Sequence, residues 1–178
     1  GHWEGAIMKS ISVLTGVRFQ PEHFLQHMKK SKKFSYIDFS YVDTLYSPCW
    51  VFQLRVAIPV TKSVKRYAGY YAGFEESTMT PGKLSRLPGS HPVEVAEQAI
   101  LPSRLTEDQA LKQAWDYNKL WVVRKFKCLY APPELEDHKT ELVYKPMYLM
   151  RFYNRDLDEE KYKVMDSLSG DLEDLVLE

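Results

Sequence analysis

Several features that would assign this 178-residue chain to a class directly are absent. Its two cysteines, Cys49 and Cys128, are too far apart for a metal knuckle and too few for a dense disulfide framework. Lys and Arg together number 24, as do Asp and Glu, so the basic excess of a dedicated nucleic-acid binder is missing. The longest uncharged runs, such as residues 47–53, are far shorter than the roughly 20 residues of a membrane-spanning helix. We therefore expect a globular protein without a transmembrane segment.

Sequence motifs that carry catalysis or bind cofactors are also missing. There is no Gly-x-Ser-x-Gly elbow, glycine-rich phosphate loop or His-Glu-x-x-His sequence. His23 and His27 would share one helix face, but no third ligand follows at a suitable spacing, which favours a solvated surface. The acidic residues within 156–160 lack the glycine of a calcium loop and indicate a solvated hairpin tip. We therefore expect no enzymatic activity, no cofactor and no metal.

The two cysteines and the N-terminus leave questions open. Cys49 and Cys128 lie in apolar stretches, which favours core packing over a nucleophilic role, and their redox state is undecided. The chain begins with Gly1-His2 and has no initiator Met, which is typical of a cleavage scar. If an upstream signal or anchor was removed, the natural protein is extracytoplasmic or membrane-anchored; otherwise it is cytoplasmic.

What the sequence does contain is a succession of helical and strand-like periodicities. Pro21 in the first turn and the lysines within 29–33 predict the start and end of one helix. Thr106 followed by Gln109 is the capping-box pattern and predicts the start of a second helix. Alternation of apolar residues predicts strands at 37–41, 45–58, 66–74, 144–152 and 162–166. The same criteria predict helices at 3–14 and 93–100, a strand at 121–130 and a loop at 132–139. The fold class is therefore α+β.

Two of the predicted strands resemble each other, which indicates an internal duplication. Residues 46–54 align with residues 144–152 in a register that preserves the two strand faces. Each stretch follows a predicted helix and precedes a strand with an Arg/Lys-Tyr pair. We therefore expect two related helix-plus-antiparallel-sheet units, at 1–80 and 105–178, joined by a Pro/Gly-rich connection at 81–104. Whether the two units pack as one body is open.

Three pieces of the second half carry a family resemblance: the helix start at 105–114, the strand at 148–153 and the closing stretch at 162–171. Together they resemble a PepSY-type domain, the small cystatin-like helix-and-hairpin module of peptidase propeptides and many bacterial envelope proteins. In this chain Met165 stands between Val164 and Asp166, where the family has a Val-Asp pair, and the first half matches less well. The resemblance implies a peptidase-regulating or ligand-sensing module without catalysis.

The turn at Asp166, Ser169 and Gly170 has a structural interpretation of its own. An Asp side chain accepts hydrogen bonds from N–H groups two or three residues on, and Gly supplies a positive φ. We therefore expect this turn to be part of the scaffold. The recognition surface is expected elsewhere.

The function that these patterns favour is non-enzymatic binding or regulation, with a peptide or a protein, such as a peptidase, as the partner. The aromatic side chains on strand faces are the predicted ligand contacts, or else core: Tyr46, Trp50, Tyr70, Tyr71, Tyr144 and Tyr148. A partner strand pairing with a sheet edge is one possible mode. Two alternatives stay open: a hydrolase with a dispersed active site, and a nucleic-acid binder that uses lysines within 29–33 and 62–66 with neighbouring tyrosines. The oligomeric state is unknown.

Overall fold

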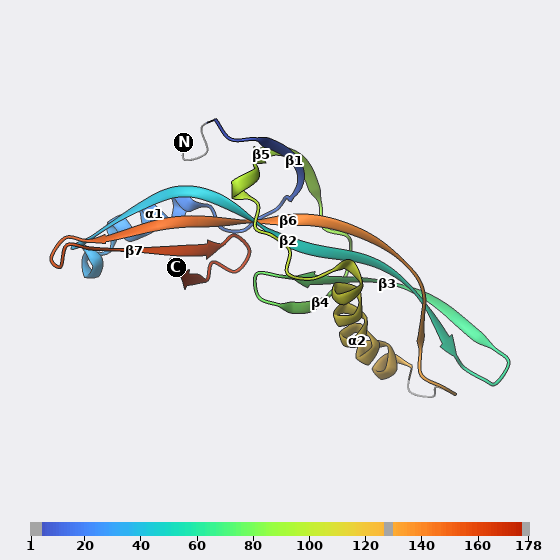
Figure 1. Cartoon of the computed structure of the whole chain (residues 1–178). Coiled ribbons are helices and arrows are strands. Elements are labelled where there is room, and N and C mark those ends of the chain that lie inside the picture. Colours follow the sequence, from blue (N-terminus) through green and yellow to red (C-terminus); the bar gives the residue numbers. More distant parts are fainter. Residues whose placement is uncertain (1–4, 127–129, 176–178) are drawn as a thin grey trace. The chain divides into compact units, whose positions relative to one another are not determined.

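The computed structural model describes residues 5–126 and 130–175, and every structural statement concerns these residues. They contain two α-helices, two short 3₁₀ turns and eight strands, so the fold is α+β (Figure 1). The elements in chain order are β1 (Met8–Leu14), α1 (Pro21–Lys30), η1 (Lys32–Phe34), β2 (Ile37–Pro59), β3 (Lys65–Glu75), β4 (Thr80–Leu84), β5 (Ser90–Ala96), η2 (Glu97–Ala99), α2 (Glu107–Lys125), β6 (Glu134–Asn154), β7 (Glu159–Asp166) and β8 (Leu172–Asp174).

The chain forms two compact units that are not consecutive in sequence. Unit 1 draws on Gly1–Ser47, Gly89–Leu101 and Tyr144–Glu178, and unit 2 on Pro48–Pro88 and Pro102–Val143. The long strands β2 and β6 each give one half to each unit. The sequence predicted two units made of consecutive residues, 1–80 and 105–178. This division stays a prediction.

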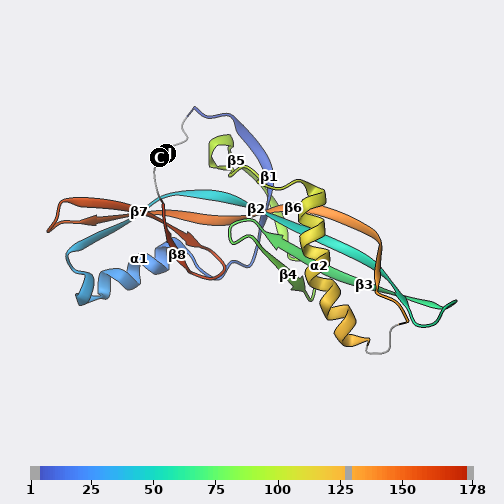
Figure 2. The same ribbon diagram turned by 60° about the horizontal axis from the view of Figure 1, so that its bottom comes forward.

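Unit 2 consists of helix α2 and four strand segments. The order is β4, β3, the second half of β2 and the first half of β6. Helix α2 contacts β3 and β4 (Figure 2). Its small residues Ala110 and Ala114 are fully buried beside Phe52, so the helix can approach the sheet closely. The expected capping box is confirmed, because Thr106 and Gln109 exchange side chain-to-backbone hydrogen bonds.

Unit 1 has strand segments in a corresponding order, β8, β7, the second half of β6 and the first half of β2, together with α1. Phe24 of α1 packs against Phe39 of β2 and Phe152 of β6, with ring centroids 6.1 Å away in both cases. Strands β1 and β5 pair along seven residues, and β1 meets β6 at Val13 and Tyr144. Unit 1 thus buries Met150 and Met165 among aromatic rings, whereas the core of unit 2 combines two phenylalanines with aliphatic residues and alanines.

Four local predictions are wrong. Residues Met8–Leu14, within the predicted helix at 3–14, form strand β1, and Ser90–Ala96 form strand β5 where a helix was expected over 93–100. Each strand supplies the hydrogen-bonding partner of the other, a pairing that is distant in sequence and outweighs local propensity. Helix α2 extends to Lys125 where a strand was predicted to begin at 121, and β6 begins at Glu134 inside the predicted loop. The end of that predicted strand, including Cys128, lies outside the described residues.

The two sequence halves share an order of elements. The first runs α1, β2, β3, β4 and the second runs α2, β6, β7, β8. The hairpins begin at matching pairs, Cys49 with Glu75 and Met147 with Asp166. Four residues after each of these acids the backbone takes a positive φ, 51° at Met79 and 76° at Gly170. The two hairpins can therefore be compared residue by residue.

Candidate functional site

The six predicted ligand contacts are divided between the two units. Trp50, Tyr70 and Tyr71 belong to unit 2, and Tyr46, Tyr144 and Tyr148 belong to unit 1. Within unit 1, Tyr144 is half-buried where β6 meets β1. The structure therefore assigns three of the predicted contacts to each unit.

Trp50 contributes to the scaffold of unit 2. Its indole N–H donates a 2.9 Å hydrogen bond to the carboxylate of Glu76, which is only 2% exposed. The same carboxylate accepts hydrogen bonds from the Arg104 backbone N–H, at 2.6 Å, and from the Ser103 hydroxyl. The Trp50 ring also stacks on the buried Phe52. The polar edge of Trp50 is therefore already engaged inside the unit.

Tyr46 and Tyr148 lie in a group of tyrosines in unit 1. Tyr148 is 5% exposed, and its hydroxyl donates to the Gln20 side-chain oxygen at 3.3 Å. The rings of Tyr41 and Tyr148 are 6.4 Å apart. Burial, followed by the charge of Glu22, raises the pKa of Tyr148 to about 12, and burial also raises the pKa of Tyr41 and Tyr46. These phenols are therefore neutral hydrogen-bonding groups at physiological pH.

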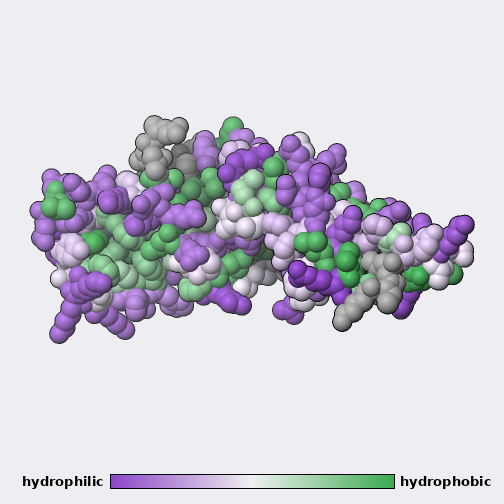
Figure 3. Space-filling model, turned by 90° about the horizontal axis from the view of Figure 1, so that it is seen from below, coloured by the Kyte–Doolittle hydropathy of each residue, from purple (hydrophilic) through white to green (hydrophobic). Residues whose placement is uncertain are grey.

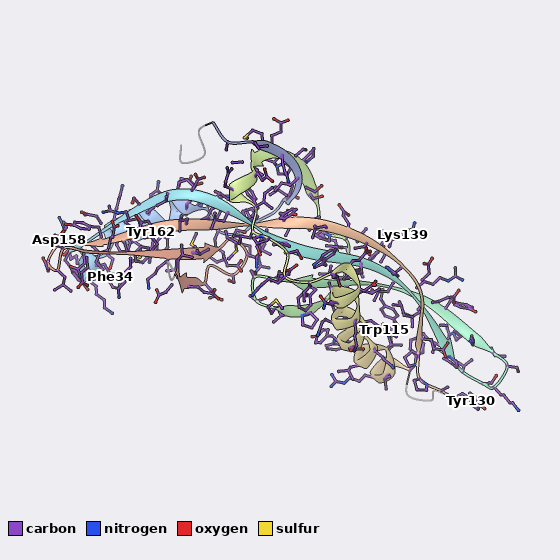
Figure 4. The ribbon with its side chains drawn as sticks, viewed as in Figure 1. Phe34, Trp115, Tyr130, Lys139, Asp158 and Tyr162 are labelled. Carbon is purple, nitrogen blue, oxygen red and sulfur yellow. The ribbon has the colours of Figure 1, made fainter. Side chains whose placement is uncertain are left out.

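Tyr70 and Tyr71 line a hollow of about 370 Å³ on unit 2, which we call the β3 hollow. Strands β2, β3 and β6 contribute three residues each. They are Gln53, Leu54, Arg55, Gly69, Tyr70, Tyr71, Asp137, His138 and Lys139. The hollow thus combines aromatic, cationic and amide groups from three strands, with Lys139 labelled in Figure 4.

The hollow is open because β3 has a glycine at its centre. Positions 67, 69 and 71 lie on one face of the strand, since successive residues point to opposite sides. Gly69 pairs with Arg55 across the sheet, and a Cβ added at Gly69 would meet no atom within 4 Å. The register continues through Gly69 without interruption, so β3 has no bulge there. The glycine therefore removes a side chain without bending the strand.

Charged groups of both signs surround the hollow. The guanidinium of Arg55 lies 4.8 Å from the ring centroid of Tyr67, within the range of a cation–π interaction. Arg55 Nε is 3.7 Å from a carboxylate oxygen of Glu136, which is longer than a hydrogen bond. Among the lining residues, Arg55 and Lys139 are cationic and Asp137 is anionic. The Arg55 side chain is 59% exposed, so its terminal N–H groups are accessible to a ligand.

Tyr70 differs from Tyr71 in its surroundings. Tyr71 is 36% exposed, whereas the Tyr70 hydroxyl is buried and makes no hydrogen bond to the rest of the described structure. Burial raises the pKa of Tyr70, so its phenol stays protonated. Tyr71 is therefore the one of the two that presents its ring to a ligand.

Sequence reasoning anticipated only part of the hollow. It selected Tyr70 and Tyr71 as aromatic residues but missed Arg55, Gly69 and Lys139. The alternation of residues 53–55 and 67–71 showed which side chains share a face of β2 and of β3. It did not show that Asp137 and Lys139 lie beside them, because that depends on the pairing of β2 with β6.

A buried ion pair in unit 1 was also missed. Lys145 is fully buried, and its Nζ donates to Asp166 Oδ2 at 2.6 Å. The other oxygen of Asp166 accepts the backbone N–H groups of Leu168 and Ser169. Burial alone would raise the pKa of Asp166, but the hydrogen bonds from Lys145 and these N–H groups outweigh it and lower that pKa. These contacts and the positive φ of Gly170 confirm the structural interpretation of the turn.

Residues 5–126 and 130–175 contain neither a metal-binding cluster nor a membrane-spanning helix. No three His, Cys, Asp or Glu side chains of that part gather closely enough to hold a metal ion. His23 and His27 are both exposed on α1. No helix there is long and apolar enough to cross a membrane. Cys49 is buried in unit 2, and Cys128 lies outside the described ranges.

Comparison with known proteins returned no match. No family model matches the chain, and neither a curated protein nor a solved structure does.

Proposed function

We propose that the protein is a non-enzymatic binding module that holds a segment of a peptide or protein partner in the β3 hollow. The observation that carries this proposal is the convergence of Tyr71, Arg55 supported by Tyr67, and the open position at Gly69. Tyr and Arg are enriched among the residues that dominate protein interfaces. The volume of about 370 Å³ suits a few side chains of a partner.

Binding at a sheet face is better supported than pairing with a sheet edge. Strands β4 and β5 end the main strand order of the sheet, and each carries a proline, Pro81 and Pro92; the other edge strand, β8, has only three residues. Proline has no N–H to donate, so it weakens an edge as a template for another strand. Hydrophobic side chains are also exposed between hydrophilic ones on the molecular face in Figure 3, as is usual for proteins, and they single out no further site.

We propose further that the chain is an internal duplication of a PepSY-like unit. The common order of elements and the matching hairpin registers support the duplication. The PepSY-like character rests on the motifs in residues 105–171, and a peptidase as the partner rests on that resemblance alone. Regulation of a peptidase is therefore a more specific proposal than binding, and it depends on the family resemblance.

A selection experiment tests the binding proposal. The protein is immobilised and used to select from a random peptide display library, and the affinities of enriched peptides are measured by fluorescence anisotropy. Gly69→Val should abolish binding, because it fills the hollow where the structure leaves space for a Cβ. Gly82→Val is the matched control, since a Cβ at Gly82 on β4 also meets no atom within 4 Å and Gly82 does not line the hollow.

Two results would contradict the proposal. One is that no peptide is enriched over a library selected on an unrelated protein. The other is that Gly69→Val and Gly82→Val bind the enriched peptides equally well. Circular dichroism and urea unfolding of both variants check that neither substitution acts by unfolding unit 2.

A further inference from the structure

We infer that the β3 hollow recognises a carboxylate, and that an acidic side chain of the partner takes the place that Glu160 fills in unit 1. This inference rests on the proposed binding function and names the chemistry of the ligand. It comes from comparing the two hairpins within the molecule.

The comparison depends on the register of the hairpins. Counted from the open end, the fifth pair is Gln53 with Tyr71 in one hairpin and Arg151 with Tyr162 in the other (Tyr162 is labelled in Figure 4). The seventh pair is Arg55 with Gly69 in the first and Tyr153 with Glu160 in the second. The position of Gly69 is therefore the position of Glu160.

In unit 1 this position already holds a carboxylate. Glu160 Oε2 accepts a 2.7 Å hydrogen bond from Arg151 Nε, and both side chains are partly exposed. The guanidinium of Arg151 lies 5.1 Å from the ring centroid of Tyr153. The chain itself thus provides an example of a carboxylate held on a sheet face by an arginine that rests on a tyrosine.

Unit 2 also has an arginine and two tyrosines here, although Arg55 takes the position of Tyr153 and Gln53 takes that of Arg151. Arg55 rests on Tyr67, and Tyr71 stands where unit 1 has Tyr162. The arginine lies directly across from Gly69, a separation at which cross-strand side chains interact. Lys139 adds a second cation at the rim of the hollow. A carboxylate supplied from outside would therefore meet an arginine that rests on a tyrosine, as Glu160 does, and would compete with Glu136 for Arg55.

The charges of the lining favour a carboxylate over a doubly charged phosphate. The planar guanidinium fork matches the two oxygens of a carboxylate. Asp137 lines the hollow, and Glu136 lies 3.7 Å from Arg55, so both repel an incoming anion. This repulsion is larger for two negative charges than for one. An acidic peptide side chain therefore fits better than a phosphorylated one.

A carboxyl group introduced into the hollow tests this inference without a partner. In Gly69→Glu, the new carboxyl should titrate below the value of about 4.3 for free glutamate. Carbon-detected NMR measures this pKa directly. Adding Arg55→Gln to the same chain should return the pKa to its ordinary value. A pKa at or above the ordinary value in Gly69→Glu, or one that Arg55→Gln leaves unchanged, would overturn the inference.

Peptides from the display selection provide the second test. Each acidic residue of an enriched peptide is replaced by its amide, and one replacement should weaken binding about tenfold through the loss of a charged hydrogen bond. Arg55→Gln should weaken binding of the acidic peptide by the same factor. The acidic peptide and its amide form should then bind this variant with equal affinity. If peptides bind the hollow without preferring an acid, the inference of carboxylate recognition is overturned, and the proposed binding function still stands. If no peptide is enriched, the binding proposal fails, and the Gly69→Glu titration still decides the chemistry of the position.

Discussion

The hairpins β2–β3 and β6–β7 share a register and differ in what they leave exposed. Unit 1 pairs Arg151 with its own Glu160 at 2.7 Å, whereas Arg55 in unit 2 lies across from Gly69 beside a hollow and has Glu136 at 3.7 Å. In both hairpins the arginine lies near a tyrosine ring. The two surfaces differ by Glu160 against Gly69, and they also differ in where the arginine stands, because Arg55 takes the position of Tyr153.

The two units also handle their buried acids in different ways. Asp166 in unit 1 is neutralised by the buried Lys145, whereas Glu76 in unit 2 is bound by the Trp50 indole, the Ser103 hydroxyl and a backbone N–H. Buried charges require such partners, because an unpaired one is costly to remove from water. Asp166 therefore has a cation and two backbone N–H groups as partners, whereas the Glu76 carboxylate accepts three hydrogen bonds from neutral groups.

The largest expected effect comes from breaking the ion pair of unit 1. Lys145→Met leaves Asp166 buried without its cation and should lower the free energy of unfolding by about 3–5 kcal/mol. Urea denaturation measures the change. The double variant Lys145→Met with Asp166→Leu should recover part of the loss, since it removes both charges. Equal stability of the wild type and Lys145→Met would contradict this account of unit 1.

The same pair predicts the pH dependence of unit 1. The pKa of Asp166 is lower in the folded than in the unfolded protein, so its contribution is complete above the unfolded value of about 3.9. This contribution is lost as the pH falls through the folded pKa. Urea unfolding across pH 2–7 should show a steeper acid loss for the wild type than for Asp166→Asn. Parallel curves would show that Asp166 does not contribute.

The hydrogen bonds around Glu76 provide the counterpart in unit 2. Trp50→Phe keeps a ring but removes the N–H donor, and it should destabilise the protein by about 1–3 kcal/mol. The remaining donors to Glu76 make this effect smaller than the loss of Lys145. Thermal unfolding provides the measurement. A larger loss than for Lys145→Met would reverse the contrast between the two units.

The matching turns allow a smaller, paired prediction. A Cβ at Gly170 would lie 2.9 Å from the Phe19 ring at a φ of 76°, so Gly170→Ala should destabilise by more than about 1 kcal/mol. Met79 has a φ of 51°, and Met79→Gly should stabilise by up to about 1 kcal/mol, because it relieves the left-handed strain. Chemical denaturation of both variants tests this. Changes of the same sign would show that the turns are not equivalent.

Part of the fold and of the candidate site could be predicted from the sequence. The helix start at Thr106, the turn at Asp166 and the strand 66–74 depend on neighbouring residues, so local patterns predicted them. Tyr70 and Tyr71 were selected because strand alternation places aromatic residues on faces. The carboxylate-binding arrangement that we propose could not be predicted, because Gly69 carries no side chain and the strands that surround it are distant in sequence.

The sequence by itself determined the α+β class, the helix caps and the faces of the strands, because these depend on residues a few positions apart. The tertiary structure alone decided that Met8–Leu14 is a strand, since its partner Ser90–Ala96 lies far along the chain. It also decided that β2 and β6 each contribute to two units. Strand pairing joins distant residues through backbone hydrogen bonds, which side-chain patterns specify only in part. The β3 hollow forms from three such strands, so it exists only in the folded sheet.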